Sequence, residues 1–329
     1  MDQSTVFIVC VILMAYLFDF INGFHDAANS IATIVTTGVL TPFQAVLWAA
    51  FFNFVAFLFF NLMVANTIGT GLIDVHLIDA KLIFAALIGA IFWNLVTWYY
   101  GLPSSSSHAL IGGLAGAAIV RGGFASLKMA GFIKVAIGIF ISPIVGLLMS
   151  VLLTYLFTRL SRRDNEPRLN QLFKSFQLIS SALLSLTHGG NDAQKTMGII
   201  AVLLFSTSWL QGEFYVPFWV VISCHLVISL GTLAGGWRIV HTLGTKITTL
   251  NPLRGCAAET GAAAIIFAAT EYGVPVSTTQ TVTGAIAGVG LIGGLGGPQW
   301  RMLRIIYLSW MLTIPASAIV SALIILIIH

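Results

Sequence analysis

Long hydrophobic segments, separated by short polar stretches, follow one another along the whole chain. Most are close to the ~20 residues that a membrane-spanning helix needs. They cover approximately residues 4–22, 42–64, 80–100, 132–160, 171–187, 216–235, 255–272 and 304–328. Two glycine-rich apolar stretches at 104–120 and 276–296 have the small residues that allow close helix packing in lipid. The pattern predicts an all-α polytopic membrane protein.

Composition agrees with this prediction. Hydrophobic residues make up 58% of the chain and charged residues 8%, whereas soluble domains are about a quarter charged. The formal net charge of +4 agrees with the excess of Lys and Arg that membrane proteins have in their cytoplasmic loops. We therefore expect the lipid bilayer as a partner, and we expect no nucleic acid. The three cysteines have neither metal-binding nor disulfide spacing.

Two polar motifs interrupt the hydrophobic segments, and each occurs twice in the same order. The aspartate motif is GFHDAANS at residues 23–30 and GGNDAQKT at 189–196, which places Asp26 and Asp192 166 positions apart. The serine motif is GLPSSSSH at 101–108 and GVPVSTTQ at 273–280, 172 positions later. Polar, glycine-containing interruptions at matching places in two hydrophobic halves indicate a secondary transporter with its site between the halves.

The distribution of Lys and Arg predicts the topology. Basic residues gather between the halves, so we expect a cytoplasmic linker at 161–170 and external termini. Each half, 1–160 and 171–329, then crosses the membrane an odd number of times, and an odd-crossing unit repeated in tandem is inverted. This parity holds whether residues 80–120 form two spans or a re-entrant hairpin with the serines at its tip.

The aspartate motif supplies the chemistry of a coupling ion. We expect Gly23 and its polar neighbours to break a helix within residues 4–37, because non-helical backbone at membrane depth needs a protein-lined or watery cavity. A carboxylate in the membrane costs several kcal/mol unless it is paired. Asp26 and Asp192, with amide and backbone oxygens, suit a hard cation such as sodium, or can carry a proton.

Differences between the two copies favour protons. Asn29 in the first copy aligns with Lys195 in the second, so we hypothesise that this ammonium replaces one bound cation and pairs with Asp192. His25 adds a group that titrates near neutral pH. Glu259, in an apolar stretch, is a candidate proton relay or partner of Lys195.

The serine motif predicts an anion site. Hydroxyl groups and free N–H groups at the start of a helix, with the positive end of the helix dipole behind them, bind oxyanions. Two such starts that meet across the repeat could surround a small tetrahedral oxyanion. The candidate donors are Ser105, Ser106 and Ser107 in the first half and Ser277, Thr278 and Thr279 in the second.

Over essentially its entire length, and in both duplicated motifs, the chain resembles the PiT family of inorganic phosphate transporters. The resemblance implies inverted repeats with broken helices and re-entrant hairpins tipped by serine and threonine, in a protein that is commonly a homodimer. It also implies that Asp26, Asn29, Asn191 and Asp192 bind cation and phosphate, with Asp26 and Asp192 as metal ligands if sodium is the coupling ion. His25, Gln194 and Lys195 depart from the common signature and resemble the bacterial low-affinity branch, which is associated with protons and neutral metal–phosphate complexes.

The sequence therefore predicts a cation-coupled importer of inorganic phosphate in the inner membrane of a prokaryote, with no cofactor and with H⁺ favoured over Na⁺ as the coupling ion. A sulfate symporter of the same family is the alternative substrate class. An intramembrane hydrolase using His108 and one of the neighbouring serines is a remote alternative, because no Gly-x-Ser-x-Gly elbow is present. A passive channel is a third possibility.

Overall fold

The computed structural model describes residues 3–161, 166–292 and 297–328, and within these ranges it contains α-helices and no β-strand. The α-helices are α1 (Gln3–Thr36), α2 (Pro42–Val55), α3 (Met63–Thr70), α4 (Ala80–Tyr99), α5 (Ser106–Gly122), α6 (Met129–Leu160), α7 (Glu166–Ser206), α8 (Phe218–Ala234), α9 (Trp237–Thr245), α10 (Pro252–Glu271), α11 (Thr278–Val289) and α12 (Trp300–Ile328). Short 3₁₀ turns lie at Ala56–Leu58, Val75–Leu77 and Phe124–Ser126. The predicted fold class, an all-helical polytopic membrane protein, is confirmed.

The same series of helices occurs in α1–α6 and in α7–α12. Each series has a long helix, a bent pair, a two-helix hairpin and a long helix with an internal proline, Pro143 or Pro315. The bends are 83° between α2 with its 3₁₀ extension and α3, and 71° between α8 and α9. The hairpins begin at matched caps, where Asp79 and Asn251 accept the N–H groups of Leu82 and Arg254. The inverted relation of the halves stays a prediction.

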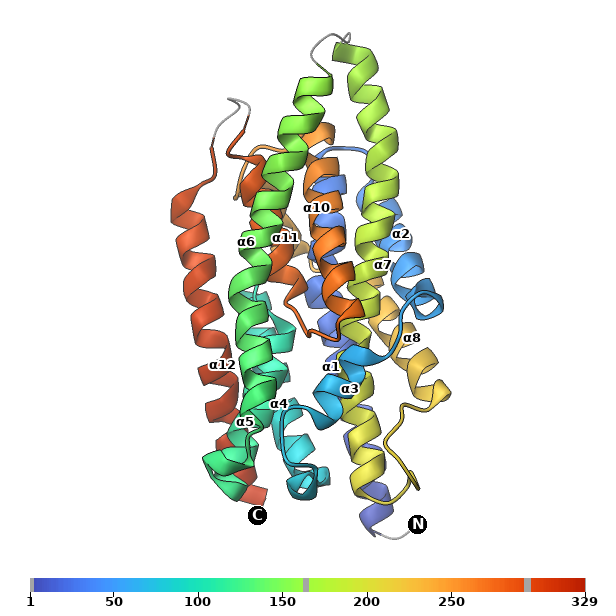
Figure 1. The fold of residues 1–329 in the computed structure, drawn as a ribbon, viewed down its shortest axis with the longest axis vertical. Coiled ribbons are helices and arrows are strands. Elements are labelled where there is room, and N and C mark those ends of the chain that lie inside the picture. Colours follow the sequence, from blue (N-terminus) through green and yellow to red (C-terminus); the bar gives the residue numbers. More distant parts are fainter. Residues whose placement is uncertain (1–2, 162–165, 293–296, 329) are drawn as a thin grey trace.

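Among the described residues, four helices, α1, α4, α6 and α12, are long and apolar enough to cross a membrane, and the number is six if each bent pair forms one span. Both described chain ends lie at one end of the molecule, and the end of α6 and the start of α7 lie at the other (Figure 1). Of the predicted linker 161–170, residues 162–165 lie outside the described residues, and α7 already begins at Glu166.

The two hairpins approach the middle of the molecule from opposite ends. In Figure 1, α4 and α5 lie in the half towards the termini, and α10 and α11 lie in the half towards the α6–α7 junction. Each hairpin packs against the last helix of the other series, α5 on α12 and α11 on α6. A Cβ on Gly116 would lie 2.1 Å from the Ala318 carbonyl oxygen, and one on Gly288 2.4 Å from that of Leu147. The predicted close packing of the glycine-rich stretches is therefore present in both halves.

The expected helix break at the aspartate motif is wrong, because both α1 and α7 run through their motifs as continuous helices. The helices are broken elsewhere, at the bent pairs. Gly23 serves close packing, since a Cβ there would lie 2.2 Å from the Ile228 carbonyl oxygen of α8. Two polar side chains of the motif reach neighbouring helices, His25 to Thr97 of α4 and Asn29 to Thr279 of α11.

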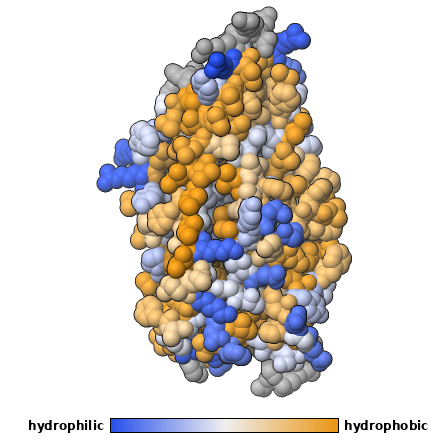
Figure 2. All heavy atoms as spheres, in the orientation of Figure 1, coloured by the Kyte–Doolittle hydropathy of each residue, from blue (hydrophilic) through white to orange (hydrophobic). Residues whose placement is uncertain are grey.

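Large hydrophobic side chains cover most of the exterior seen in Figure 2, with hydrophilic residues grouped near mid-height and at the two ends. On α6 the exposed large side chains include Ile137, Ile141 and Ile144, each more than half exposed. Apolar area on this scale is far larger than soluble monomers leave in contact with water. A hydrocarbon environment around α6 and α12 explains it.

Candidate functional site

The tips of the two hairpins form matched helix starts. Ser105 is the N-cap of α5 and accepts the His108 N–H at 3.3 Å, and Ser277 is the N-cap of α11 and accepts the Gln280 N–H at 3.2 Å. The side chains of His108 and Gln280 lie 3.5 Å apart between ring Nδ1 and amide Nε2. Two helix N-termini, each with its row of hydroxyl groups, therefore meet inside the protein.

The two motif aspartates lie together beside these tips. One ligand atom each from Asp26, His188 and Asp192 falls within a group whose members are all within 4.8 Å of one another. His25 Nδ1 contacts Asp26 Oδ1 at 2.6 Å, and its Nε2 lies 3.1 Å from the Thr97 hydroxyl of α4. These side chains are buried, with exposures of at most 2% for His25, Asp26 and Asp192. The stretches that the sequence separates by 166 residues thus share one closed interior site.

Lys195 joins three segments at this site. Its ammonium donates to Asp192 Oδ1 and to the Ser107 hydroxyl, both at 2.5 Å, and to the Val276 carbonyl oxygen at 3.2 Å. The partners come from α7, the tip of the first hairpin and the tip of the second. All three contacting atoms are oxygens, the kind of ligand that a hard cation takes in proteins.

Equivalent positions of the two motifs make equivalent contacts across the halves. Asn29 on α1 donates to the Thr279 hydroxyl of α11 at 2.9 Å, as Lys195 on α7 donates to Ser107 of α5. Thr279 and Ser107 are themselves 172 positions apart, the spacing of the serine motif. Each aspartate motif therefore contacts the hairpin of the opposite series.

The other predicted donors complete the arrangement. Thr278 donates its hydroxyl to Asp192 Oδ2 at 3.2 Å, and Asn191 donates to the Thr270 hydroxyl at 2.8 Å. Among the described residues, the Ser106 hydroxyl and the amide oxygens of Asn29 and Asn191 are buried without a hydrogen-bond partner. Unpaired buried polar atoms beside two helix N-termini are what an oxyanion and its coupling ion would satisfy.

Glu259 does not contact Lys195. It is fully buried between α1, α7 and α10, where it accepts from Thr33 and Ser180 at 2.5 Å each and from Gln177 Nε2 at 2.9 Å. No Lys, Arg or His lies within ion-pair distance of it in the part of the chain that the structure describes. This carboxyl is held by neutral donors, an environment that suits a proton-carrying group.

Three groups near the site were not predicted from the sequence. His188 places Nε2 3.4 Å from Asp192 Oδ2. Thr97 holds the second nitrogen of His25. Asp19 is a fully buried carboxylate of α1 that contacts Thr196 of α7. Its position seven residues before Asp26 was the available signal, because seven residues are close to two helical turns.

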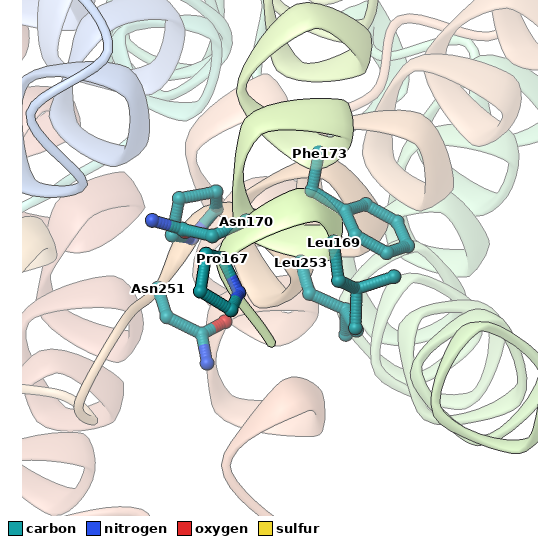
Figure 3. A pocket seen from close by; sticks show the side chains of 7 residues that line it. Pro167, Leu169, Asn170, Phe173, Asn251 and Leu253 are labelled. Carbon is teal, nitrogen blue, oxygen red and sulfur yellow. The ribbon is translucent and has the colours of Figure 1, made fainter. Parts of the chain in front are cut away.

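A pocket of about 530 Å³ lies apart from the motifs, where α7 and α10 begin. Figure 3 shows its lining, which includes Pro167, Asn170, Phe173 and Asn251 and no residue of either motif. A hydrolytic site is not assembled either. Within the described chain, the His108 side chain makes no hydrogen bond to a serine hydroxyl, and Ser107 is held by Lys195 instead.

Comparison with known proteins decides the family. The model of the Phosphate transporter family matches residues 22–321. The chain belongs to this family. It is 56% identical to a Rhizobium meliloti protein named "Probable low-affinity inorganic phosphate transporter", over 98% of this chain and 97% of that protein. A Bacillus subtilis protein of the same name is 41% identical over the same shares.

A solved structure supports the same assignment. The structure titled "The sodium-dependent phosphate transporter" superposes with a TM-score of 0.90 and 25% sequence identity, covering 98% of this chain and 99% of that one. The protein is thus a phosphate transporter and not an enzyme, as the motifs predicted. Its resemblance to the PiT family is confirmed.

Proposed function

We propose that the protein imports inorganic phosphate by symport with protons. The observation that carries this proposal is the ammonium of Lys195, which contacts three oxygens at a position where the other half has the amide of Asn29. A fixed cation there leaves less need for a mobile one such as sodium. His25 and Glu259 add two buried groups that can exchange protons.

Phosphate would lie between the hairpin tips. The hydroxyl groups of Ser105, Ser106 and Ser107 and those of Ser277, Thr278 and Thr279 would donate to it, with the helix N-termini behind them. The amides of Asn29 and Asn191 would add polar contacts from the two long helices. Asp26 and Asp192 can accept the hydrogen that phosphate carries near neutral pH, which favours phosphate over sulfate because sulfate has no hydrogen to donate.

The experiment measures labelled phosphate uptake into proteoliposomes under an imposed pH gradient or an imposed sodium gradient. We expect the pH gradient to drive accumulation and Asp26→Asn to abolish it. Full accumulation set by a sodium gradient at fixed pH would reverse the assignment of the ion. Uptake that never exceeds the external concentration would indicate a passive channel.

Sodium or a metal–phosphate complex is the second candidate for the coupled species. The cluster of Asp26, His188 and Asp192 favours it, since its ligand atoms lie close enough to share one ion. Phosphate uptake that needs a divalent cation, and that carries the labelled metal with it, would support the complex. Competition by sulfate tests the alternative substrate. Strong inhibition of labelled phosphate uptake by sulfate, with weak inhibition by unlabelled phosphate, would favour a sulfate carrier.

The proposed setting is the inner membrane of a prokaryote, with repeats 1–160 and 171–329 in inverted orientation and the linker 161–170 in the cytoplasm. The basic residues around the α6–α7 junction, Arg159, Arg168 and Lys174, support this orientation. A homodimer is proposed from the family resemblance. Cross-linking in native membranes tests it, and accessibility of a cysteine introduced near either terminus tests the orientation.

A further inference from the structure

Asp19 is a buried carboxylate that the phosphate site as described above does not use. Its exposure is 0%, and its Oδ1 accepts the Thr196 hydroxyl at 2.8 Å. Its Oδ2 has no hydrogen-bond partner among the described residues, and none of their Lys, Arg or His side chains forms an ion pair with it. An unpaired charge in this position would be costly, so the group is stable when it carries a proton.

The position of Asp19 relates it to the central site. Asp19, Asp26 and Thr33 follow one another at intervals of seven residues, so they lie on one face of α1, with a rise of about 10 Å between neighbours. Asp26 belongs to the central site, and Thr33 holds Glu259. Carboxyl groups therefore occur at three heights along the axis of α1. Asp19 lies on the side of the termini, the motif aspartates lie in the middle, and Glu259 of α10 lies on the side of the α6–α7 junction.

The helices packed on α1 near Asp19 carry both acidic and basic groups. Tyr16 lies on α1 itself, and α8 has Cys224 and His225, of which His225 bonds to the Asn53 carbonyl oxygen. Helix α7 has Asp192 and Lys195, which pair with each other. Helix α4, which also packs on α1, has titratable side chains only near its two ends, Lys81 and Tyr99. Asn22, one turn towards the site, is buried with both amide atoms unpaired among the described residues.

We propose that Asp19 is a proton-binding residue of the transport cycle, placed on the terminus side of the central aspartates. Its carboxylate takes a proton from hydronium at Oδ2, which leaves water, while Thr196 donates to Oδ1. In the reverse step the carboxylic acid gives that proton back to water, which forms hydronium, and Asp19 returns to its anionic form. This inference rests on the proposed proton coupling. With external termini, Asp19 lies on the side from which an importer receives its protons.

The counterpart of Asp19 in the second half supplies a matched control. Ser185 of α7 lies 166 positions later, is fully buried, and donates its hydroxyl to the Ser181 carbonyl oxygen of its own helix. The proton-binding group is therefore asymmetric between the halves. Replacing Ser185 with alanine changes a buried polar residue at the matched position and removes no carboxyl group.

The test compares wild type, Asp19→Asn and Ser185→Ala in proteoliposomes by two measurements. One is phosphate accumulation driven by a pH gradient, and the other is exchange of labelled for unlabelled phosphate at equal pH. We expect Asp19→Asn to lower gradient-driven accumulation about a hundredfold, the low end of what a positioned acid–base group contributes, and to keep exchange near the wild-type rate. Ser185→Ala should retain both.

Gradient-driven accumulation by Asp19→Asn at the wild-type level would overturn the inference and leave the proposed function standing. Loss of exchange together with accumulation in a folded Asp19→Asn protein would also overturn it, because Asp19 would then serve binding or structure. If the wild-type protein accumulates phosphate under a sodium gradient and not under a pH gradient, the proposed proton coupling is wrong, and this inference is wrong with it.

A spectroscopic readout does not depend on the asparagine variant being folded. A protonated, buried carboxyl has its own infrared carbonyl band, and Asp19→Glu keeps the carboxyl while changing its surroundings. We expect Asp19→Glu to shift one such band and to retain gradient-driven uptake. An infrared spectrum of Asp19→Glu identical to that of wild type would show that Asp19 is not the protonated group.

Discussion

Replacing Lys195 with asparagine tests the idea that a fixed ammonium stands in for a mobile cation. The variant gives the second motif the residue that the first motif has at Asn29. It removes a cation that contacts Asp192, Ser107 and the Val276 carbonyl oxygen, all within 3.2 Å. The three oxygens then face a space that an ammonium no longer fills.

The magnitude follows from the burial of this ion pair, whose two side chains are 1% and 0% exposed. Removing one partner of a buried pair costs about 3–5 kcal/mol, because the other charge is left uncompensated. At about 1.4 kcal/mol per factor of ten, the population of the transport-competent state falls by about a hundredfold to a few thousandfold. A sodium ion among the same oxygens would recover much of that loss.

The assay is initial uptake of labelled phosphate into proteoliposomes at equal pH on both sides, with sodium or with choline as the external cation. We expect Lys195→Asn to be nearly inactive in choline and to gain uptake in sodium, and wild type to be indifferent to the exchange. Lys246→Asn removes an exposed lysine at the end of α9 and should behave as wild type. Unchanged coupling in Lys195→Asn, with wild-type rates in choline, would refute the reasoning.

Three further predictions concern the site, the packing and the periphery. Thr279→Val removes the hydroxyl that accepts from the first motif, and it should raise the KM for phosphate about tenfold, the effect of about one buried hydrogen bond; an unchanged KM would place phosphate elsewhere. Gly116→Ala puts a Cβ 2.1 Å from a backbone oxygen of α12 and should cost about 1–3 kcal/mol in thermal unfolding, whereas Gly297→Ala, which has open space, should not. Half-burial alone would raise the pKa of Asp79, but the hydrogen bonds from Arg121 and from the backbone outweigh it and hold this pKa below its ordinary value of 3.8. The pair therefore stabilises the fold above that value and loses its effect as pH falls through the lower folded pKa; Arg121→Gln should lower the melting temperature slightly at pH 7 and less at pH 3, and a larger effect at pH 3 would contradict this account.

Hydrophobic segments and duplicated motifs were sufficient to predict the class of protein and to select the candidate site residues. Lipid accepts only helices and closed barrels, in which all backbone groups are paired, and apolar segments of about 20 residues have the length of helices, so segment length and polarity imply a polytopic helical protein. Asp26 and Asp192 were identifiable because carboxylates are rare in such segments. The serine motifs were identifiable because a proline followed by hydroxyl residues is a helix start, and α5 and α11 begin at that point.

The course of the backbone through the aspartate motif depended on tertiary contacts. Local composition favours a break at Gly23, yet α1 is continuous and α8 packs closely against that glycine. The real bends lie between α2 and α3 and between α8 and α9. A glycine makes a helix less stable than an alanine would by about 1 kcal/mol, and tertiary packing outweighs a difference of that size.

The sequence by itself determined which residues are candidates for the transport chemistry, since their types and their duplicated spacing are properties of the chain. Only the tertiary structure decided which of them meet: Lys195 with Ser107 and Val276, Asn29 with Thr279, and Glu259 with Thr33 in place of Lys195. The reason is that each hairpin packs against helices of the opposite series, which brings Lys195 to Ser107, Asn29 to Thr279 and Glu259 to Thr33. The contact of Lys195 with Val276 joins α7 to the hairpin tip of its own series. Local periodicity specifies the face of a helix on which a side chain lies, and the packing of whole helices specifies what that face contacts.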